Sequence, residues 1–245
     1  IGGIYVGSIR GGPVKRLLEN DASPDYAMGR LFFAQGKTLM TATFDPTTQQ
    51  IKGEMTGTDV EALFDPSTGK SMFSVSLSGS LVAVEDSPTA RSTLVWIDRA
   101  GAETGVAAPE SHYNSFRLAP DSRRVAVSRN DQQAGDRGIW LIDLARGLET
   151  KFTLEPSDEI RPVWSPDSLK VAFSTDADGP YNVVIRPADR SESEARMRAV
   201  PRDQEPLDWS PDGKSLLVQD AFGGGDDSAL GILDLKTEET TVWLK

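Results

Sequence analysis

Histidine, serine and carboxylate side chains are the residues of this chain that could do hydrolytic chemistry. The sequence has one histidine, His112, and no cysteine. This excludes thiolate catalysis, disulfides and any metal site built on several histidines of one chain. A catalytic triad would need a serine nucleophile and a carboxylate close to the imidazole, and no Gly-x-Ser-x-Gly elbow is present. We therefore interpret His112 as an exposed loop residue, with ligand contact as the alternative.

Two acidic segments could offer oxygen ligands to a calcium ion. Asp176–Gly179 resembles the start of a calcium loop, and the segment from Asp220 to Asp227 places acids around three glycines. Neither has the further ligands and distal glutamate of a complete loop. We interpret both as connecting loops and predict no metal and no cofactor. Weak calcium binding at Asp176 and Asp178 is the alternative.

A recurring stretch of sequence indicates the secondary-structure elements that position these residues. Its clear copies are Leu118–Ser122, Trp164–Ser168 and Trp209–Gly213, each an apolar residue, a small residue, Pro-Asp and a turn residue. Their prolines lie 46 and 45 residues apart, and a recurrence of that length indicates a repeat architecture. Weaker copies lie at Ser23–Tyr26 and Ser76–Gly79.

Each repeat contains four short apolar segments separated by turn residues, which is typical of a propeller blade. The sequence therefore predicts an all-β chain, a β-propeller of four-stranded antiparallel blades. We count five blades plus an N-terminal half blade, and expect a single domain that is part of a six- to eight-bladed ring. The predicted bounds are 1–20 for the half blade, then 21–60, 61–108, 109–155, 156–202 and 203–245.

The Pro-Asp stretch itself is interpreted as the tight turn between the first two strands of a blade. Proline fixes φ at the first central position of such a turn, and glycine accepts a positive φ. The tryptophan before the turn is expected to face a neighbouring blade, because each blade needs the next to cover its face.

Recognition is expected on the opposite face, where the loops into strand one of each blade surround the channel. Loops on a rigid scaffold often carry binding residues, and ordinary solvated loops are the alternative. We predict a protein, peptide or small-molecule ligand at the channel mouth, contacted by His112, Tyr113, Asn114, Glu159, Arg161 and Glu205. Gln204 accompanies them, and Arg137, Asp176, Tyr181 and Asp227 are expected further out.

Charge and hydropathy exclude other partners. The net charge of −11 repels phosphate backbones, so no nucleic-acid binding is expected. No apolar run approaches the ~20 residues that span a bilayer, so we expect no membrane insertion by this segment. As a fragment, the chain is expected to be a monomer.

The Pro-Asp-Gly turns and the strand Val171–Ser174 resemble the TolB-like, WD-repeat-like β-propellers. Relatives of that family cap prolyl-oligopeptidase-type peptidases and occur in the tricorn protease. Three N-terminal stretches, Ile4–Gly12, Gly29–Phe33 and Thr93–Arg99, resemble the C-terminal propellers of bacterial receptor-type serine/threonine kinases.

The resemblance implies a non-catalytic binding or sensor domain, periplasmic or extracytoplasmic, within a membrane kinase. The kinase machinery is not in this chain, since it has no His-Arg-Asp and no Asp-Phe-Gly motif. The alternative is an accessory propeller of a prolyl-oligopeptidase-like or tricorn-like hydrolase.

Overall fold

A computed structural model describes most of the chain as strands and turns. The described residues are 3–8, 12–20, 22–61, 64–65, 70–84, 91–98, 102–130, 136–191, 195–197, 199–220 and 229–244. These residues contain no helix. The chain divides into two compact units, Ile1–His112 and Tyr113–Lys245.

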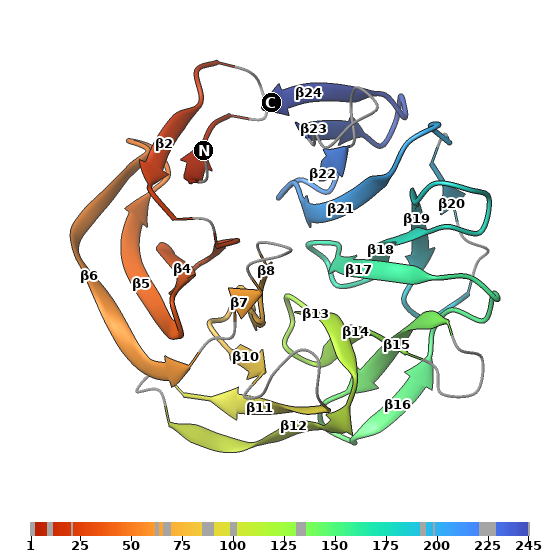
Figure 1. Cartoon of the computed structure of the whole chain (residues 1–245), viewed down its shortest axis with the longest axis horizontal. Coiled ribbons are helices and arrows are strands. Elements are labelled where there is room, and N and C mark those ends of the chain that lie inside the picture. Colours follow the sequence, from red (N-terminus) through yellow and green to blue (C-terminus); the bar gives the residue numbers. More distant parts are fainter. Residues whose placement is uncertain are drawn as a thin grey trace. The chain divides into compact units, whose positions relative to one another are not determined.

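The second unit consists of three four-stranded antiparallel sheets, each in simple up-and-down order. In Figure 1 their strands follow one another from green to blue. The first blade is β13 (Tyr113–Leu118), β14 (Arg124–Asn130), β15 (Arg137–Asp143) and β16 (Leu148–Lys151). The second is β17 (Glu159–Trp164), β18 (Lys170–Thr175), β19 (Asn182–Pro187) and β20 (Ala195–Arg196). The third is β21 (Gln204–Trp209), β22 (Ser215–Asp220), β23 (Ala229–Asp234) and β24 (Thr240–Leu244).

The first unit contains two four-stranded antiparallel sheets and two short hairpins among its described residues. One blade is β3 (Asp25–Ala27), β4 (Arg30–Gln35), β5 (Thr38–Asp45) and β6 (Gln50–Glu61). The other is β9 (Phe73–Val75), β10 (Leu81–Val84), β11 (Ser92–Ile97) and β12 (Glu103–Ser111). The hairpins are β1 (Ile4–Val6) with β2 (Lys15–Leu18), and β7 (Phe64–Asp65) with β8 (Lys70–Ser71).

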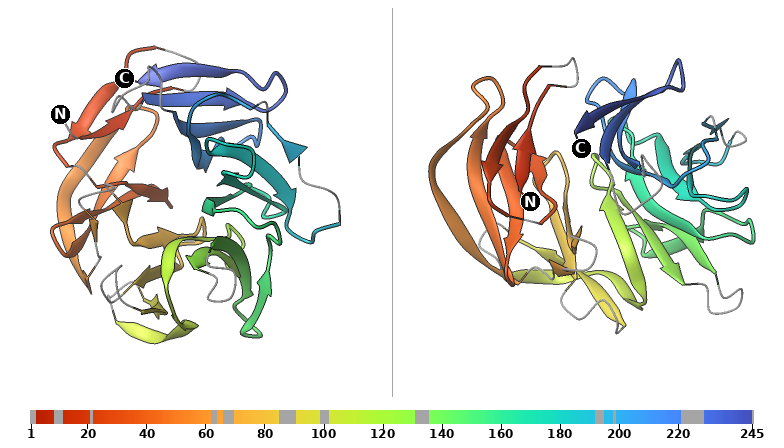
Figure 2. Two further views of the ribbon diagram at one scale, coloured as in Figure 1. Left: turned by 45° about the vertical axis from the view of Figure 1, so that its right-hand side comes forward. Right: turned by 45° about the horizontal axis from the view of Figure 1, so that its top comes forward.

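The predicted all-β architecture is confirmed: the described residues form five four-stranded antiparallel blades, preceded by the two-stranded β1–β2 sheet. The sheets twist from first to last strand (Figure 2), as chirality of the backbone requires. Central strands such as β14, β18 and β19 are buried over consecutive residues, so both faces of their sheets carry buried side chains, because within each unit a blade packs against the next.

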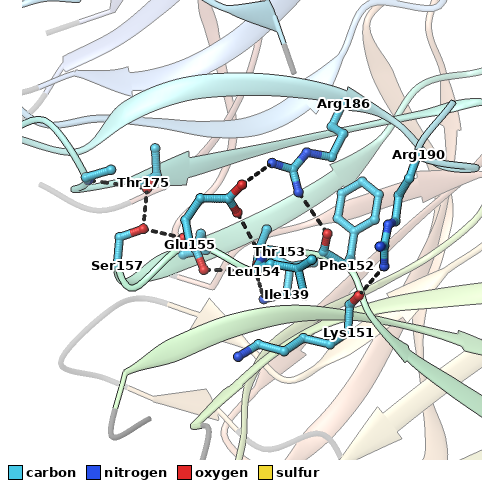
Figure 3. Close-up of polar contacts among 12 residues, drawn as sticks. Ile139, Lys151, Phe152, Thr153, Leu154, Glu155, Ser157, Thr175, Arg186 and Arg190 are labelled. Carbon is cyan, nitrogen blue, oxygen red and sulfur yellow. Dashed lines mark hydrogen bonds and ion pairs between the residues drawn. The ribbon is translucent and has the colours of Figure 1, made fainter. Parts of the chain in front are cut away.

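Apolar clusters join consecutive blades within each unit. Between the first two blades of the second unit, Ile139 and Phe152 pack with Trp164 and Phe173. Arg186 of β19 crosses this junction (Figure 3): it donates hydrogen bonds to the Phe152 carbonyl at 2.8 Å and to Glu155 at 2.9 Å.

The repeated turn has the expected structure. In the last copy, Ser210 Oγ donates to Asp212 at 2.7 Å and accepts the Ser215 amide at 2.9 Å, while Gly213 has a φ of 69°. Ser168 and Ser122 occupy the glycine position with φ of 61° and 60°. The turn is therefore retained where a non-glycine residue must adopt the left-handed region.

The tryptophan before each full turn lies between blades, as expected. Trp164 is 5% exposed and its indole N–H donates to the Arg117 carbonyl of the preceding blade at 3.0 Å. Trp209 repeats this contact one blade later, donating to the Val163 carbonyl at 3.3 Å. The tryptophan before the turn thus joins two successive pairs of blades by the same hydrogen bond.

Side chains take over from the backbone ladder beside two outer strands. After β16, which ends at Lys151, the Thr153 hydroxyl, not a backbone carbonyl, accepts the Ile139 amide. Near β20, the Val200 amide donates to the Asn182 side chain instead of to the ladder. Side chains thus replace the sheet ladder at both places.

Candidate functional site

The first strands of the three second-unit blades each carry a β-bulge. The register shifts by one residue between Tyr113 and Ser115 in β13, between Ile160 and Val163 in β17, and between Pro206 and Asp208 in β21. These strands lie in order beside one another (Figure 1). A bulge bends its strand and redirects a side chain, and bulges often accompany binding sites.

The bulge in β17 places Arg161 in the left-handed region, with a φ of 53°. This conformation costs a residue with a β-carbon roughly 1 kcal/mol or more. The surrounding blade must stabilise it, and the result is a guanidinium directed across the first strands.

Arg161 pairs with Glu205 of β21, the residue that the sequence also predicted as a candidate. Its Nη1 donates to Gln219 Oε1 at 3.0 Å. Burial lowers the pKa of Arg161; the Glu205 carboxylate opposes that effect and the Arg117 guanidinium adds to it. Arg117 of β13 reaches β21 itself, donating to the Leu207 carbonyl at 3.4 Å. Side chains from three blades therefore meet here.

We call Arg117, Arg161, Glu205 and Gln219 the inner-strand cluster. It holds two guanidinium groups and one carboxylate, so its net charge is positive in a chain of net charge −11. The arginine and glutamate of the ion pair keep 16% and 21% of their side chains exposed. Partly buried arginines of this kind bind carboxylates strongly.

Glu159 is a different kind of residue from the loop contact that we expected. It begins β17 and is 2% exposed. Its carboxylate accepts hydrogen bonds from Thr153 Oγ1 at 2.9 Å and Ser157 Oγ at 2.6 Å, and both hydroxyls belong to the segment between β16 and β17. Burial raises its pKa to about 7.

A carboxyl group that titrates near neutrality is a candidate acid or base in many sites. Here both oxygens of Glu159 are already bound within the protein and the side chain is inaccessible to a substrate. Gln204 begins β21 in the corresponding place and is equally buried, donating to Asp220 at 3.0 Å and Thr240 at 2.8 Å. Because an uncharged amide makes the hydrogen bonds there, this position fixes the beginning of the strand and requires no ionisable group.

The remaining predicted residues lie apart from the cluster or bind locally. Tyr113 begins β13 and is buried, which raises its pKa to about 12. Asn114 is exposed and its amide donates to Asn130 at 3.0 Å. His112 is a half-buried residue at the end of the first unit, between β12 and β13.

The outer loop residues of the second unit form a network of their own. Arg137 pairs with Asp158 at 2.6 Å and donates to the Tyr181 hydroxyl at 2.7 Å. Asp176 Oδ1 accepts the Asp158 amide at 2.8 Å, so it acts as a turn residue. Across the residues that the structure describes, no three His, Asp or Glu side chains are placed to hold a metal ion. Asp227, and the acidic segment after Asp220, lie outside those residues.

Sequence reasoning missed two members of the inner-strand cluster, Arg117 and Gln219. Arg117 lies one residue before the repeated turn stretch, so the pattern assigned it only to a strand. One signal could have revealed Arg117. It is a charged residue between apolar neighbours on a first strand, and the next repeat has an apolar residue, Val163, at the same position.

Comparison with solved structures gives the fold family of the chain. The fold matches a putative TolB from Agrobacterium tumefaciens with a TM-score of 0.71 and 15% identity, over 90% of this chain and 79% of that one. It also matches TolB from Acinetobacter baumannii, with a TM-score of 0.65 and 15% identity over 84% of this chain and 48% of that one. The chain is therefore a TolB-like β-propeller in fold.

Comparison of sequences identifies no particular protein. No protein-family model matches the chain. A 112-residue stretch is 26% identical to the uncharacterized peptidase YuxL of Bacillus subtilis (strain 168), covering 44% of this chain and 17% of that protein. The chain thus spans less than a fifth of that relative. In the described segments there is no helix of the length and apolarity that would cross a membrane.

Proposed function

We propose that this chain is a non-catalytic binding domain that recognises an acidic group of a protein or peptide at the inner-strand cluster. The observation that carries this proposal is Arg161, held in a left-handed bulge and paired with Glu205 beside Arg117. The cluster offers charge and hydrogen-bond donors but no hydroxyl, thiol or amine nucleophile, and its one carboxylate is paired with Arg161, which favours recognition over catalysis.

A carboxylate would enter beside Arg117 and share the Arg161 guanidinium with Glu205. Arginine presents several donors in one plane and can bind two carboxylates at once. Gln219 fixes Arg161 from the β22 side, so the donors are already oriented before a ligand arrives. Preorganised donors lose less entropy on binding.

The test is a peptide library selected on the chain, followed by calorimetry of the selected sequences. We expect enrichment of peptides with an acidic side chain or a free C-terminus. Replacing the acid of a selected peptide by its amide is expected to weaken binding at least tenfold.

Matched variants locate the site. Arg117→Gln, and the double variant Arg161→Gly with Glu205→Gln, should each weaken binding at least tenfold; glycine is chosen because it accepts the φ of 53° without strain. Arg146→Ala changes an exposed arginine in the turn after β15 and should leave binding unchanged. Equal loss in all three variants, or no acidic preference, would contradict the proposal.

The setting of the domain is proposed on separate grounds. The resemblance of Ile4–Gly12 and Thr93–Arg99 to kinase-linked propellers supports an extracytoplasmic or periplasmic sensor of a membrane serine/threonine kinase. The likeness to the peptidase YuxL supports the second candidate, an accessory propeller of a hydrolase. The coding sequence on either side decides: a kinase domain and membrane span before the propeller support the first, and a Gly-x-Ser-x-Gly domain after it supports the second.

A further inference from the structure

The first unit contains a cavity of about 320 Å³ between its two four-stranded blades. Its floor is apolar and belongs to the cluster that joins the two sheets, while its rim carries polar side chains and the turn glycine. The lining residues are Met28, Arg30, Phe32, Leu39, Thr41, Thr58, Val60, Gly79, Leu81, Ile97 and Asp98. A cavity of this volume is at the lower end of small-molecule sites.

The strand registers show which side chain fills this place in the other repeats. Trp164 pairs with Val171 at the end of β17, and Trp209 pairs with Leu216 at the end of β21. In the first unit the corresponding pair is Val75 with Leu81, and Leu81 lines the cavity. An isopropyl group therefore stands where two other blades have an indole.

The arginine that covers the indole is also repeated. Arg124 begins β14, lies over the Trp164 ring with 4.8 Å to its centroid, and donates to the Ser168 carbonyl at 2.7 Å. Arg30 begins β4 in the same place and lines the cavity. It has no tryptophan beneath it at the corresponding position, and its Nε donates to Thr41 Oγ1 at 2.8 Å.

The opposite wall compensates only in part. On the facing sheet, Phe32 is equivalent to Ala126, because Phe32 pairs with Asp25 of β3 and Ala126 pairs with Arg117 of β13. A phenyl ring therefore replaces a methyl group at this position. Phe32 nevertheless stays half-buried against the cluster, whereas Ala126 is fully buried. The larger side chain on this wall does not fill the space, since the cavity remains between Phe32 and Leu81.

We propose that this cavity binds a small planar aromatic molecule of about the size of indole, in the place of the missing tryptophan ring. The floor of Leu39, Val60 and Leu81 removes apolar surface from water. Phe32 offers a ring for edge or offset contact. Arg30 supplies the cation above the ring that Arg124 supplies over Trp164. The cavity is in the first unit, and the residues of the inner-strand cluster are in the second.

Indole is the probe for the direct test. Titration followed by ¹⁹F NMR of 5-fluoroindole should show saturable one-site binding, and cyclohexanol, which is similar in size but not planar, should bind at least tenfold more weakly. Absence of saturable binding at millimolar indole, or equal binding of cyclohexanol, would overturn the proposal.

A matched pair of substitutions locates the ring. Val75→Trp places the indole that the repeat lacks and should abolish binding of the probe, whereas Val106→Trp adds the same side chain at a surface position that is 63% exposed and should leave binding unchanged. Retained binding in Val75→Trp would place the probe elsewhere and sink the idea.

A crystallographic measurement covers the case in which Val75→Trp does not fold. Crystals of the unchanged chain soaked with 5-bromoindole should show the bromine anomalous signal between β4 and β10. A signal anywhere else, with none at this place, would count against the site as clearly as the variant would.

Discussion

Glu159 shows how a buried acid couples this fold to pH. Its pKa is about 7 in the folded chain, against an ordinary value of 4.5, because burial penalises the charged form. Between those two values the folded state holds a proton that the unfolded state has released. The contribution of Glu159 to the free energy of unfolding is therefore fully present below about pH 4.5 and is lost as the pH rises towards 7. At ~1.4 kcal/mol per pKa unit, the contribution lost is about 3–4 kcal/mol.

Glu159→Gln should remove this pH dependence, because the amide keeps the neutral state at every pH. Gln204 already fills the corresponding place in the next blade, so the substitution has a precedent within the chain. We expect the variant to be more stable than the parent at pH 8 and close to it at pH 5, measured by urea unfolding at both values.

A control separates the charge from the shape of the side chain. Glu159→Ala removes both and should destabilise the chain at pH 5 and pH 8, because it leaves the Ser157 and Thr153 hydroxyls without their acceptor. If the Gln variant kept the parent's slope between pH 5 and 8, Glu159 would not be the group responsible.

At the scale of the element, two residues of the repeated turn stretch have different structural roles. Trp164 packs between blades and is hydrogen-bonded to Arg117, whereas Asp167 is exposed and binds only inside its own turn, accepting Ser165 Oγ at 2.6 Å and the Leu169 amide at 2.9 Å. The tryptophan therefore serves the junction between sheets and the aspartate serves the local bend.

Trp164→Ala should accordingly cost about 3–5 kcal/mol of unfolding free energy, as for other large-to-small core changes. Asp167→Ala should cost about 1 kcal/mol, since two exposed turn hydrogen bonds are lost. Denaturant unfolding of both variants measures the difference, with Leu154→Ala as a surface control at a side chain that is 64% exposed. Equal losses for Trp164 and Asp167 would show that the turn, and not the junction, limits stability.

The same repeat explains how far the sequence could predict the structure. The spacing of Pro120, Pro166 and Pro211 predicted the blades because a turn must recur wherever a four-stranded unit recurs. The conformation of Arg161 had no such signal, because a bulge depends on how two strands register and arginine has no preference for a positive φ. Glu159 was expected at the channel mouth because it lies where the chain enters strand one, and nothing in the repeat showed that Thr153 and Ser157 would make its burial acceptable.

The candidate site was predictable only as a pair of residues from separate blades. Arg161 and Glu205 were both expected near the strand-one ends, and the structure brings them into contact. Arg117 was missed because its repeat equivalent is Val163, so its charge belongs to one blade and not to the pattern. The repeat therefore predicted the blades, whereas the residues of the candidate site had to be found where one blade differs from the others.

At the scale of the whole molecule, the charge of the chain and the charge of its proposed site have opposite signs. The chain carries −11, and an anionic ligand approaching from a distance meets that net charge before it meets Arg117 and Arg161. Repulsion of this kind extends about 30 Å at 0.01 M salt but only about 8 Å at 0.15 M. Added salt should therefore ease the approach of an acidic peptide even though it weakens the final ion pairs.

The association rate constant of a selected acidic peptide should consequently rise several-fold between 0.01 and 0.15 M salt, while the dissociation rate constant also rises. Stopped-flow measurements give both constants, and the same peptide with its acid replaced by an amide should show an association rate that hardly depends on salt. An association rate that falls as salt is added would mean that the local guanidinium field dominates at long range. In that case the acidic surface must lie away from the face that bears the cluster, and the net charge could not be used to predict its partners.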